Sequence, residues 1–178
     1  MPRVSQAHLD ARRQQIIDAA RVLFASRGFA RTSMADVADA LGLSVGSIYR
    51  YFESKDDVIV AICEQSRQAL PTELTPEAIS DFFEHIRARA RDEDHARLIA
   101  QIYAEAAVTP VLAQLVAGQL DDLRDAIEAL LPRHEEAPRK QLAEVFVALC
   151  QGYIGQLAVR GDLDPTPFAA ALNTLTAP

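Results

Sequence analysis

The chain has 178 residues, of which 49% are hydrophobic, and it carries a formal net charge of −7. This length is enough to bury about 70% of the unfolded surface in one or two domains. Taken over the whole chain, the negative charge argues against a nucleic-acid partner.

The distribution of charge along the chain reverses that argument. Residues 1–55 contain eight lysines and arginines against five acidic residues, a net charge of +3, whereas residues 56–178 contain ten against twenty, a net charge of −10. A basic first part on an acidic body orients the approach to DNA and keeps the body away from it.

The first predicted helix spans residues 8–26 and ends at Gly28, because a glycine just after a helix adopts the left-handed conformation at little cost. Its apolar residues recur at the spacing of one helical face. They are Ile16, Ala19, Ala20, Leu23 and Phe24. This helix is expected to complete a small core with the two helices that follow.

Residues 32–55 read TSMADVADALGLSVGSIYRYFESK and predict two short helices joined by a tight turn. Thr32 and Ser33 are candidate caps of the first helix, Gly42 suits the turn, and Ser44 is a candidate cap of the second. Val45, Ile48 and Phe52 are expected on the inner side of the second helix. The plain alternative is a two-helix corner with a solvated polar face, but the joint arrangement favours a helix-turn-helix that reads DNA.

The outer face of this motif carries small, hydroxylated, aromatic and cationic residues, which suit an approach to the major groove with phosphate contacts at the flanks. We predict that Thr32 and Ser33, at a helix start, and Tyr49, Tyr51 and Lys55 contact phosphates. The residues expected nearest to base edges are Val45, Gly46, Ser47 and Arg50, with Ser44 beside them.

The N-terminal third resembles the DNA-binding domain of TetR-family transcriptional regulators, over roughly residues 10–62. The matching residues are Ile16, Ala19, Ala20, Phe24, Gly28, Thr32, Ser33, Ala38, Ala40, Gly42, Ser44, Ile48, Tyr49, Tyr51, Phe52 and Lys55. The resemblance implies a ligand-binding body and a helix that joins it to the DNA-binding part. It also implies repression, whereas nothing about the ligand carries over.

The rest of the chain predicts an all-α fold of about nine helices. A linking helix is expected over residues 54–69, with Ser54 as its cap, and Pro71 and Pro76 mark a boundary. We therefore predict a helix-turn-helix domain over residues 1–55 and a helical body over residues 70–178. In the body, helices are expected after Pro76, over 95–108, 111–131 and 139–159, and after Pro165, with a charged connection over 87–94.

The predicted helix over residues 139–159 has an apolar stripe that is too wide for one neighbour. Gly152 and Gly155 within it allow another backbone to come close, at a cost of about 1 kcal/mol each in helix propensity. With the last helix it is a candidate four-helix dimer interface, although the same faces could close the core of a single chain. Two motifs spaced roughly 34–36 Å apart would read a palindromic site.

The body also offers aromatic and polar residues among aliphatic ones, the usual lining of a small-molecule site. The candidate ligand-binding residues are Phe82, Phe83, Gln101, Tyr103, Phe146, Cys150 and Tyr153. For each of them the alternative is an ordinary place in the core.

Other functional classes find no support. The four histidines and two cysteines form no catalytic or metal-spaced constellation, and no glycine-rich phosphate loop occurs. We therefore expect no enzymatic activity, no cofactor and no metal. No run reaches the roughly 18 apolar residues of a membrane span, so we expect a cytoplasmic protein.

Two hypotheses follow. The first is a homodimeric DNA-binding transcriptional regulator, a repressor released from a palindromic operator by a small-molecule ligand. The second is a DNA-binding adaptor or architectural protein of the same fold, whose body binds a protein partner. An enclosed apolar cavity would favour the first, and a packed interior with an exposed interaction patch the second.

Overall fold

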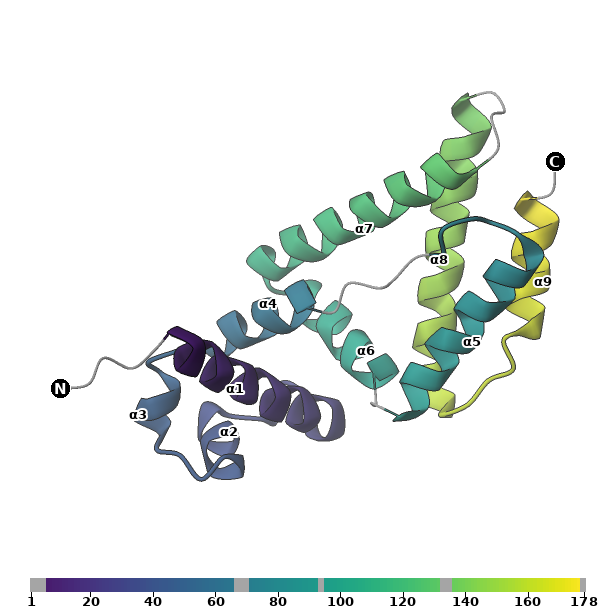
Figure 1. Cartoon of the computed structure of the whole chain (residues 1–178). Coiled ribbons are helices and arrows are strands. Elements are labelled where there is room, and N and C mark those ends of the chain that lie inside the picture. Colours follow the sequence, from purple (N-terminus) through teal and green to yellow (C-terminus); the bar gives the residue numbers. More distant parts are fainter. Residues whose placement is uncertain (1–5, 66–70, 93–94, 132–135, 177–178) are drawn as a thin grey trace. The chain divides into compact units, whose positions relative to one another are not determined.

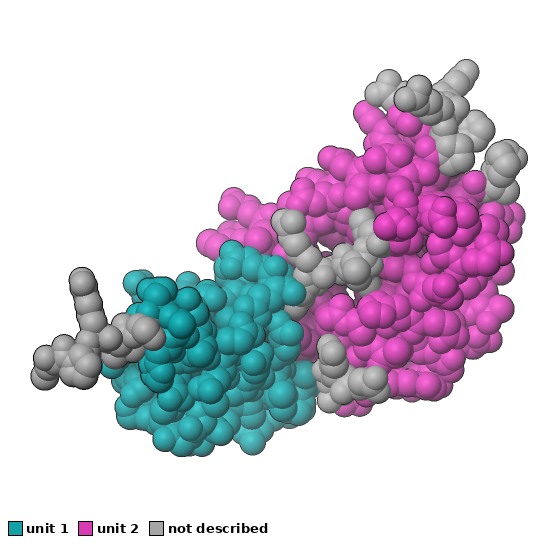
Figure 2. All heavy atoms as spheres, viewed as in Figure 1, with its two compact units in different colours: residues 1–66 teal, residues 67–178 magenta. Residues whose placement is uncertain are grey.

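The computed structural model describes residues 6–65, 71–92, 95–131 and 136–176. Within these ranges it contains nine α-helices and no strand, which confirms the predicted all-α class with an N-terminal helix-turn-helix. The chain divides into two compact units, Met1–Ser66 and Arg67–Pro178 (Figure 2). We call them unit 1 and unit 2.

Unit 1 contains four helices, which are α1 (Gln6–Arg27), α2 (Met34–Ala40), α3 (Val45–Ile48) and α4 (Lys55–Gln65). Helix α1 packs against both α2 and α4, and α2 packs against α3 (Figure 1). The apolar stripe of α1 meets side chains of the other three helices and of the loop after α3 in one small core. Its most buried members are Ile16, Ile17, Ala20, Phe24, Val37, Ala38, Ile48, Phe52, Val58 and Ile62. The predicted linking helix ends at Gln65, and residues 66–69 of that prediction lie outside the described residues.

Unit 2 contains five helices, which are α5 (Pro76–Asp92), α6 (His95–Ala106), α7 (Pro110–Leu130), α8 (Glu136–Arg160) and α9 (Thr166–Thr176). Helix α8 contacts the other four, and α5 also contacts α6 and α9 (Figure 1). An aromatic cluster fills the space between α5, α8 and α9. The Phe83 and Tyr153 rings lie 5.2 Å apart, edge to face, and Tyr153 and Phe168 lie 4.6 Å apart. Tyr153 is fully buried, and its hydroxyl donates to the Leu163 carbonyl (2.9 Å).

The predicted charged connection over residues 87–94 is wrong for its first part, because α5 continues to Asp92. Arginine is a good helix former, and the buried side chain of Ile86 and the partly buried Ala90 extend the apolar stripe. Arg87 and Arg91, four residues apart on one face, both donate to the Asp162 carboxylate in the turn before α9. These arginines therefore hold two elements of unit 2 together.

The prediction that no segment has the length and polarity of a membrane span is wrong for α8. Its segment Arg139–Arg160 is long and apolar enough to cross a membrane by length and composition, with a mean hydropathy of 1.5. The core helix of a soluble protein meets the same criterion, and in unit 2 α8 contacts each of the other four helices. Only 39% of this segment is buried within the chain, so a large part of it faces outward.

Candidate nucleic-acid interface

The start of α2 is set by reciprocal hydrogen bonds between Ser33 and Asp36. The Asp36 N–H donates to Ser33 Oγ (3.2 Å), and the Ser33 N–H donates to the Asp36 carboxylate (2.7 Å). This is a capping box, which satisfies two free donors of the helix end. The bonds from Ser33 hold the pKa of Asp36 below its usual value, and Arg27, 3.6 Å away, adds to this effect.

The turn between α2 and α3 depends on Gly42, whose φ is +63°. The Gly42 N–H donates to the Asp39 carbonyl (3.1 Å), and the Leu43 N–H donates to the Ala38 carbonyl (2.9 Å). Together these bonds satisfy the last carbonyls of α2 and reverse the chain within a few residues. Helix α3 can therefore begin at Val45.

Helix α3 is a single turn capped by Ser44, whose Oγ accepts from the Ser47 N–H (3.3 Å). Ile48 is fully buried and anchors the helix to the core. Val45 was predicted to face inward with Ile48, but 36% of it is exposed. A Cβ placed on Gly46 would meet no atom within 4 Å, so the backbone is open to solvent at this point.

The exposed residues of α3 and its caps form one surface, which we call the recognition ridge. It consists of Ser44, Val45, Gly46, Tyr49 and Arg50, all exposed. Four of the five are uncharged, and Tyr49 is half exposed. Ser47 and Tyr51 lie at its side and are partly buried. A short, low-profile ridge with a phenol and a guanidinium at one end has the features of a major-groove reader with phosphate contacts at its flank.

Two of the residues predicted to contact phosphates, Thr32 and Lys55, make hydrogen bonds inside unit 1. Ser33, and not Thr32, is the N-cap of α2, and only 1% of Thr32 is exposed. The Thr32 hydroxyl donates to the Gly28 carbonyl (2.9 Å), so the side chain holds the turn between α1 and α2. Lys55 is partly buried, and its Nζ donates to the carbonyls of Phe29 (3.0 Å) and Thr32 (3.1 Å). The S-x-x-D spacing from Ser33 to Asp36 was the local signal for the correct cap.

The predicted ligand-binding residues of unit 2 fall into two groups. Five of them, Phe82, Phe83, Phe146, Cys150 and Tyr153, lie together in its buried core. There the rings pack against one another and burial raises the pKa of the Cys150 thiol to about 12. Gln101 and Tyr103 are partly buried on α6, outside that core.

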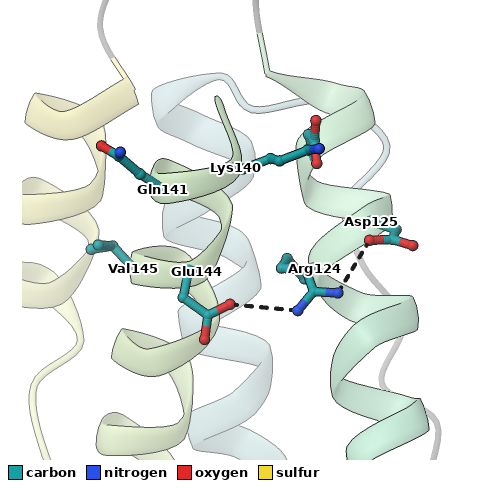
Figure 3. A pocket seen from close by; sticks show the side chains of 7 residues that line it. Arg124, Asp125, Lys140, Gln141, Glu144 and Val145 are labelled. Atoms are coloured by element: carbon teal, nitrogen blue, oxygen red, sulfur yellow. Dashed lines mark ion pairs between the residues drawn. The ribbon is translucent and has the colours of Figure 1, made fainter. Parts of the chain in front are cut away.

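A charged groove between α7 and α8 was not predicted (Figure 3). Its volume is about 670 Å³, and it is lined by Arg124, Asp125, Glu128, Lys140, Gln141, Glu144 and Val145. Arg124 lies at its centre, 3.6 Å from the Asp125 carboxylate and 3.7 Å from that of Glu144. No local pattern indicates this groove, because its lining comes from two different helices. Among the described residues, no group of three or more metal-ligating side chains could hold a metal ion.

The known proteins that this chain resembles in sequence are bacterial transcriptional regulators. Residues 16–62 match a family model described as bacterial regulatory proteins, tetR family. The chain is 28% identical to the HTH-type transcriptional repressor Rv1474c of Mycobacterium tuberculosis, over 97% of this chain and 95% of that protein. It is 23% identical to the HTH-type transcriptional repressor AcnR of Corynebacterium diphtheriae, over 92% of this chain and 90% of that protein.

Solved structures share the fold over the same extent. Salmonella enterica GusR matches with a TM-score of 0.77 at 19% identity, over 98% of this chain and 99% of that chain. The multidrug binding protein EbrR, solved in complex with imidazole, matches with a TM-score of 0.73 at 21% identity, over 100% of this chain and 98% of that chain.

An all-helical chain with an exposed recognition ridge on a basic N-terminal unit has the design of a DNA-binding transcriptional regulator. The family match and the full-length similarity to transcriptional repressors agree with that design. The match of residues 16–62 and the similarity to transcriptional repressors together support a TetR-family regulator.

Proposed function

We propose that the protein is a homodimeric repressor, which binds a palindromic operator with one recognition ridge from each copy and releases it when a small molecule binds unit 2. The observation that carries this proposal is the exposure of the ridge, from Ser44 to Arg50, around the buried anchor Ile48. In this proposal Ser44, Val45, Gly46, Ser47 and Arg50 lie nearest to base edges. The phosphate contacts in this proposal come from Ser33, Tyr49, Tyr51 and Lys55.

The DNA-binding half of the proposal is tested by gel retardation with DNA from upstream of the protein's own gene. Arg50→Ala is expected to weaken binding, and Ser47→Ala is expected to change which sequence is preferred. Tyr49→Phe removes only the hydroxyl group, so it should weaken binding to all sequences alike. Wild-type protein that binds no upstream fragment at low ionic strength would contradict the DNA-binding role.

A second surface supports dimerisation. We call it the small-residue face, and it consists of Val145, Ala148, Gly152, Gly155 and Val159 on α8 with Pro167, Ala170, Ala171 and Thr174 on α9, all exposed. It contains no charge, and a Cβ on Gly152 or Gly155 would meet no atom within 4 Å. Helices α8 and α9 pack side by side, so two copies related by a two-fold axis would form a four-helix interface there.

The dimer is tested with Ala148→Arg, which places a cation in the small-residue face. Sedimentation equilibrium is expected to give the mass of a monomer. The affinity for the operator is expected to fall in the same variant, because a single helix-turn-helix binds DNA weakly. Ala104→Arg, at an exposed alanine of α6 outside the small-residue face, is the matched control and should remain a dimer. A dimeric Ala148→Arg protein would rule out this face as the interface.

The ligand in this proposal acts through population shift, since it needs only a higher affinity for the conformation that does not fit DNA. The neighbour EbrR is a multidrug binding protein, which supports a small-molecule role for unit 2. The close packing of Phe82, Phe146 and Tyr153 favours the second candidate, a DNA-binding protein whose body binds another protein. A thermal-shift screen against small molecules separates the two. A compound that stabilises the protein and lowers operator affinity supports the repressor, whereas the adaptor should respond to none.

A further inference from the structure

One carboxylate ties the turn between α8 and α9, residues 161–165, to helix α5. Arg87 Nε donates to Asp162 Oδ1 (2.7 Å) and Arg87 Nη2 donates to Asp162 Oδ2 (3.0 Å), so the guanidinium and the carboxylate face each other through two bonds. Arg91 also donates to Oδ2. We call these three side chains the α5 clamp. It joins segments that lie 71 and 75 residues apart in the chain.

The geometry of the α5 clamp distinguishes it from an isolated surface ion pair. An isolated exposed pair contributes little to stability, because water screens it and two long side chains must become ordered. In the clamp, one carboxylate binds two guanidinium groups, one of them through two bonds, and only 23% of the Arg87 side chain is exposed. The bonds from Arg87 and Arg91 hold the pKa of Asp162 well below its usual range. The carboxylate is therefore charged, and able to bind both arginines, throughout the neutral range.

The rest of the turn is attached to the helices that it connects. Gly161 has φ +79° and ends α8, with its N–H donating to the Leu157 carbonyl (2.9 Å). The Leu163 carbonyl accepts from the hydroxyl of Tyr153 on α8 (2.9 Å). These bonds run between the turn and α8, whereas those of Asp162 run to α5. The α5 clamp therefore adds a third point of attachment, outside the two connected helices.

The small-residue face is built from the two helices that this turn connects. Val159 on α8 and Pro167 on α9 belong to the face and lie on either side of the turn. Helix α9 packs against α5 as well as against α8 (Figure 1). In a two-fold interface the same surface of each copy meets the other, so a change in the spacing of α8 and α9 is present twice. The placement of the turn thus decides whether both halves of the face fit a second copy at the same time.

We propose that Asp162 is a positioning residue for dimerisation, which binds Arg87 and Arg91, fixes the α8–α9 turn on α5, and so holds the two halves of the small-residue face in the arrangement that a second copy fits. This inference rests on the proposed dimer. It also gives α5, whose Phe83 lies in the core of unit 2, a physical connection to the dimer interface.

The first measurement asks whether the clamp holds the turn, and it does not depend on dimerisation. Amide hydrogen exchange is compared in full-length Ala148→Arg and Ala148→Arg/Asp162→Asn, so that the small-residue face is blocked in both proteins. Asparagine keeps the shape of the side chain but replaces an acceptor oxygen by an amide donor. Exchange of the hydrogen-bonded amides of Gly161, Phe168 and Ala169 is expected to become about threefold faster. Exchange in α7 should stay unchanged, which shows that unit 2 is folded.

The second measurement is the dissociation constant of the dimer, obtained by analytical ultracentrifugation with fluorescence detection over a range of protein concentrations. A two-fold dimer contains the clamp twice, so a loss of about threefold for each clamp becomes about tenfold in the dissociation constant. Asp162→Asn is therefore expected to weaken the dimer about tenfold. Asp121→Asn is the matched control, because it removes the same charge from an ion pair within α7, 3.0 Å from Arg124, and it should dimerise as the wild type does.

Arg87→Gln/Arg91→Gln provides a second route to the same loss. It removes both guanidinium groups and should weaken the dimer by a similar factor. Adding Asp162→Asn to this variant should have no further effect, because the carboxylate has already lost its partners.

Unchanged exchange at the turn in the Asp162→Asn protein would overturn the proposal. A wild-type dissociation constant in Asp162→Asn would overturn it as well, and so would a further loss of about tenfold in the triple variant. A wild-type protein that is monomeric at every concentration would contradict the proposed dimer, and this role of Asp162 with it. The two failures are distinguishable, because in the first three outcomes the wild type still dimerises.

Discussion

The two glycines that flank the start of α3 should respond in opposite ways to the same added methyl group. Gly42 has φ +63°, a conformation that costs an L-residue about 1–2 kcal/mol. Gly46 lies inside α3, where alanine is better than glycine by about 1 kcal/mol. A Cβ at either position would meet no atom within 4 Å, so steric clash contributes to neither change.

The expected free energies follow from these terms. For Gly42→Ala, the strain is partly offset by the lower entropy of the unfolded chain, about 0.4–1 kcal/mol, which leaves unit 1 destabilised by about 1 kcal/mol. Gly46→Ala should stabilise unit 1 by up to about 1 kcal/mol. For a domain of this size, each change corresponds to a shift of about 4–8 °C in melting temperature.

The melting temperature is measured by circular dichroism. Hydrogen exchange of the amides in α2 and α3 then assigns the change in stability to unit 1. Gly42→Asn is the control, because asparagine tolerates the left-handed conformation and should recover part of the loss. Gly46→Ala should also lower DNA affinity despite its stability, because its methyl group projects from the recognition ridge. If Gly42→Ala melts at or above the wild-type temperature, or if both alanine variants shift in the same direction, the reasoning about the turn is wrong.

Three further predictions concern single polar groups. Ser33→Ala removes the cap of α2 and should destabilise unit 1 by about 1 kcal/mol, measured by urea unfolding, while Ser33→Thr keeps a hydroxyl at the cap and should retain most of the stability. Tyr153→Phe leaves the Leu163 carbonyl without its hydroxyl donor and should cost roughly 1 kcal/mol, and an unchanged melting temperature would refute that role. Asp162→Asn should lower the melting temperature of unit 2 at pH 7, because hydrogen bonds from Arg87 and Arg91 hold the pKa of this carboxyl well below its usual range.

The pH dependence of the Asp162 effect has a definite sign. A carboxyl whose pKa is lower in the folded state than in the unfolded chain stabilises the fold above the unfolded pKa, which is about 3.9. That stability is lost as the pH falls from there towards the folded value. The difference in melting temperature between the wild type and Asp162→Asn should therefore be constant near neutrality and shrink below about pH 4. A difference that is the same at pH 7 and pH 3 would contradict an ionic role for Asp162.

The helix-turn-helix could be predicted almost completely from the sequence, because its signals act over a few residues. Ser33 and Asp36 are three residues apart, and Gly42 and Ser44 both act on the backbone beside them. Such bonds form wherever the local chain has the right residues, so the pattern predicts them without knowledge of the remaining structure. The choice of Ser33 over Thr32 as the cap was also available from the spacing to Asp36.

The helical conformation of residues 87–92 could not be predicted from local patterns. Six residues with alternating arginine look like a solvated connection, and the sequence cannot indicate that two of those arginines meet Asp162, about 70 residues later. The buried core of unit 2 raises a similar problem. The apolar pattern predicts that Phe83 and Tyr153 are buried, but the pattern is the same for a ligand-lined cavity and for rings that pack on each other.

The sequence alone thus predicted the all-helical class, the turn at Gly42 and the resemblance to the TetR family, because each depends on interactions within a few residues or on a contiguous motif. Only the tertiary structure showed that Thr32 and Lys55 donate hydrogen bonds to backbone carbonyls of the α1–α2 turn. The physical reason is that a polar side chain binds whichever partner the packing of distant segments brings within hydrogen-bond distance, and for Lys55 that partner lies 23 to 26 residues earlier in the chain.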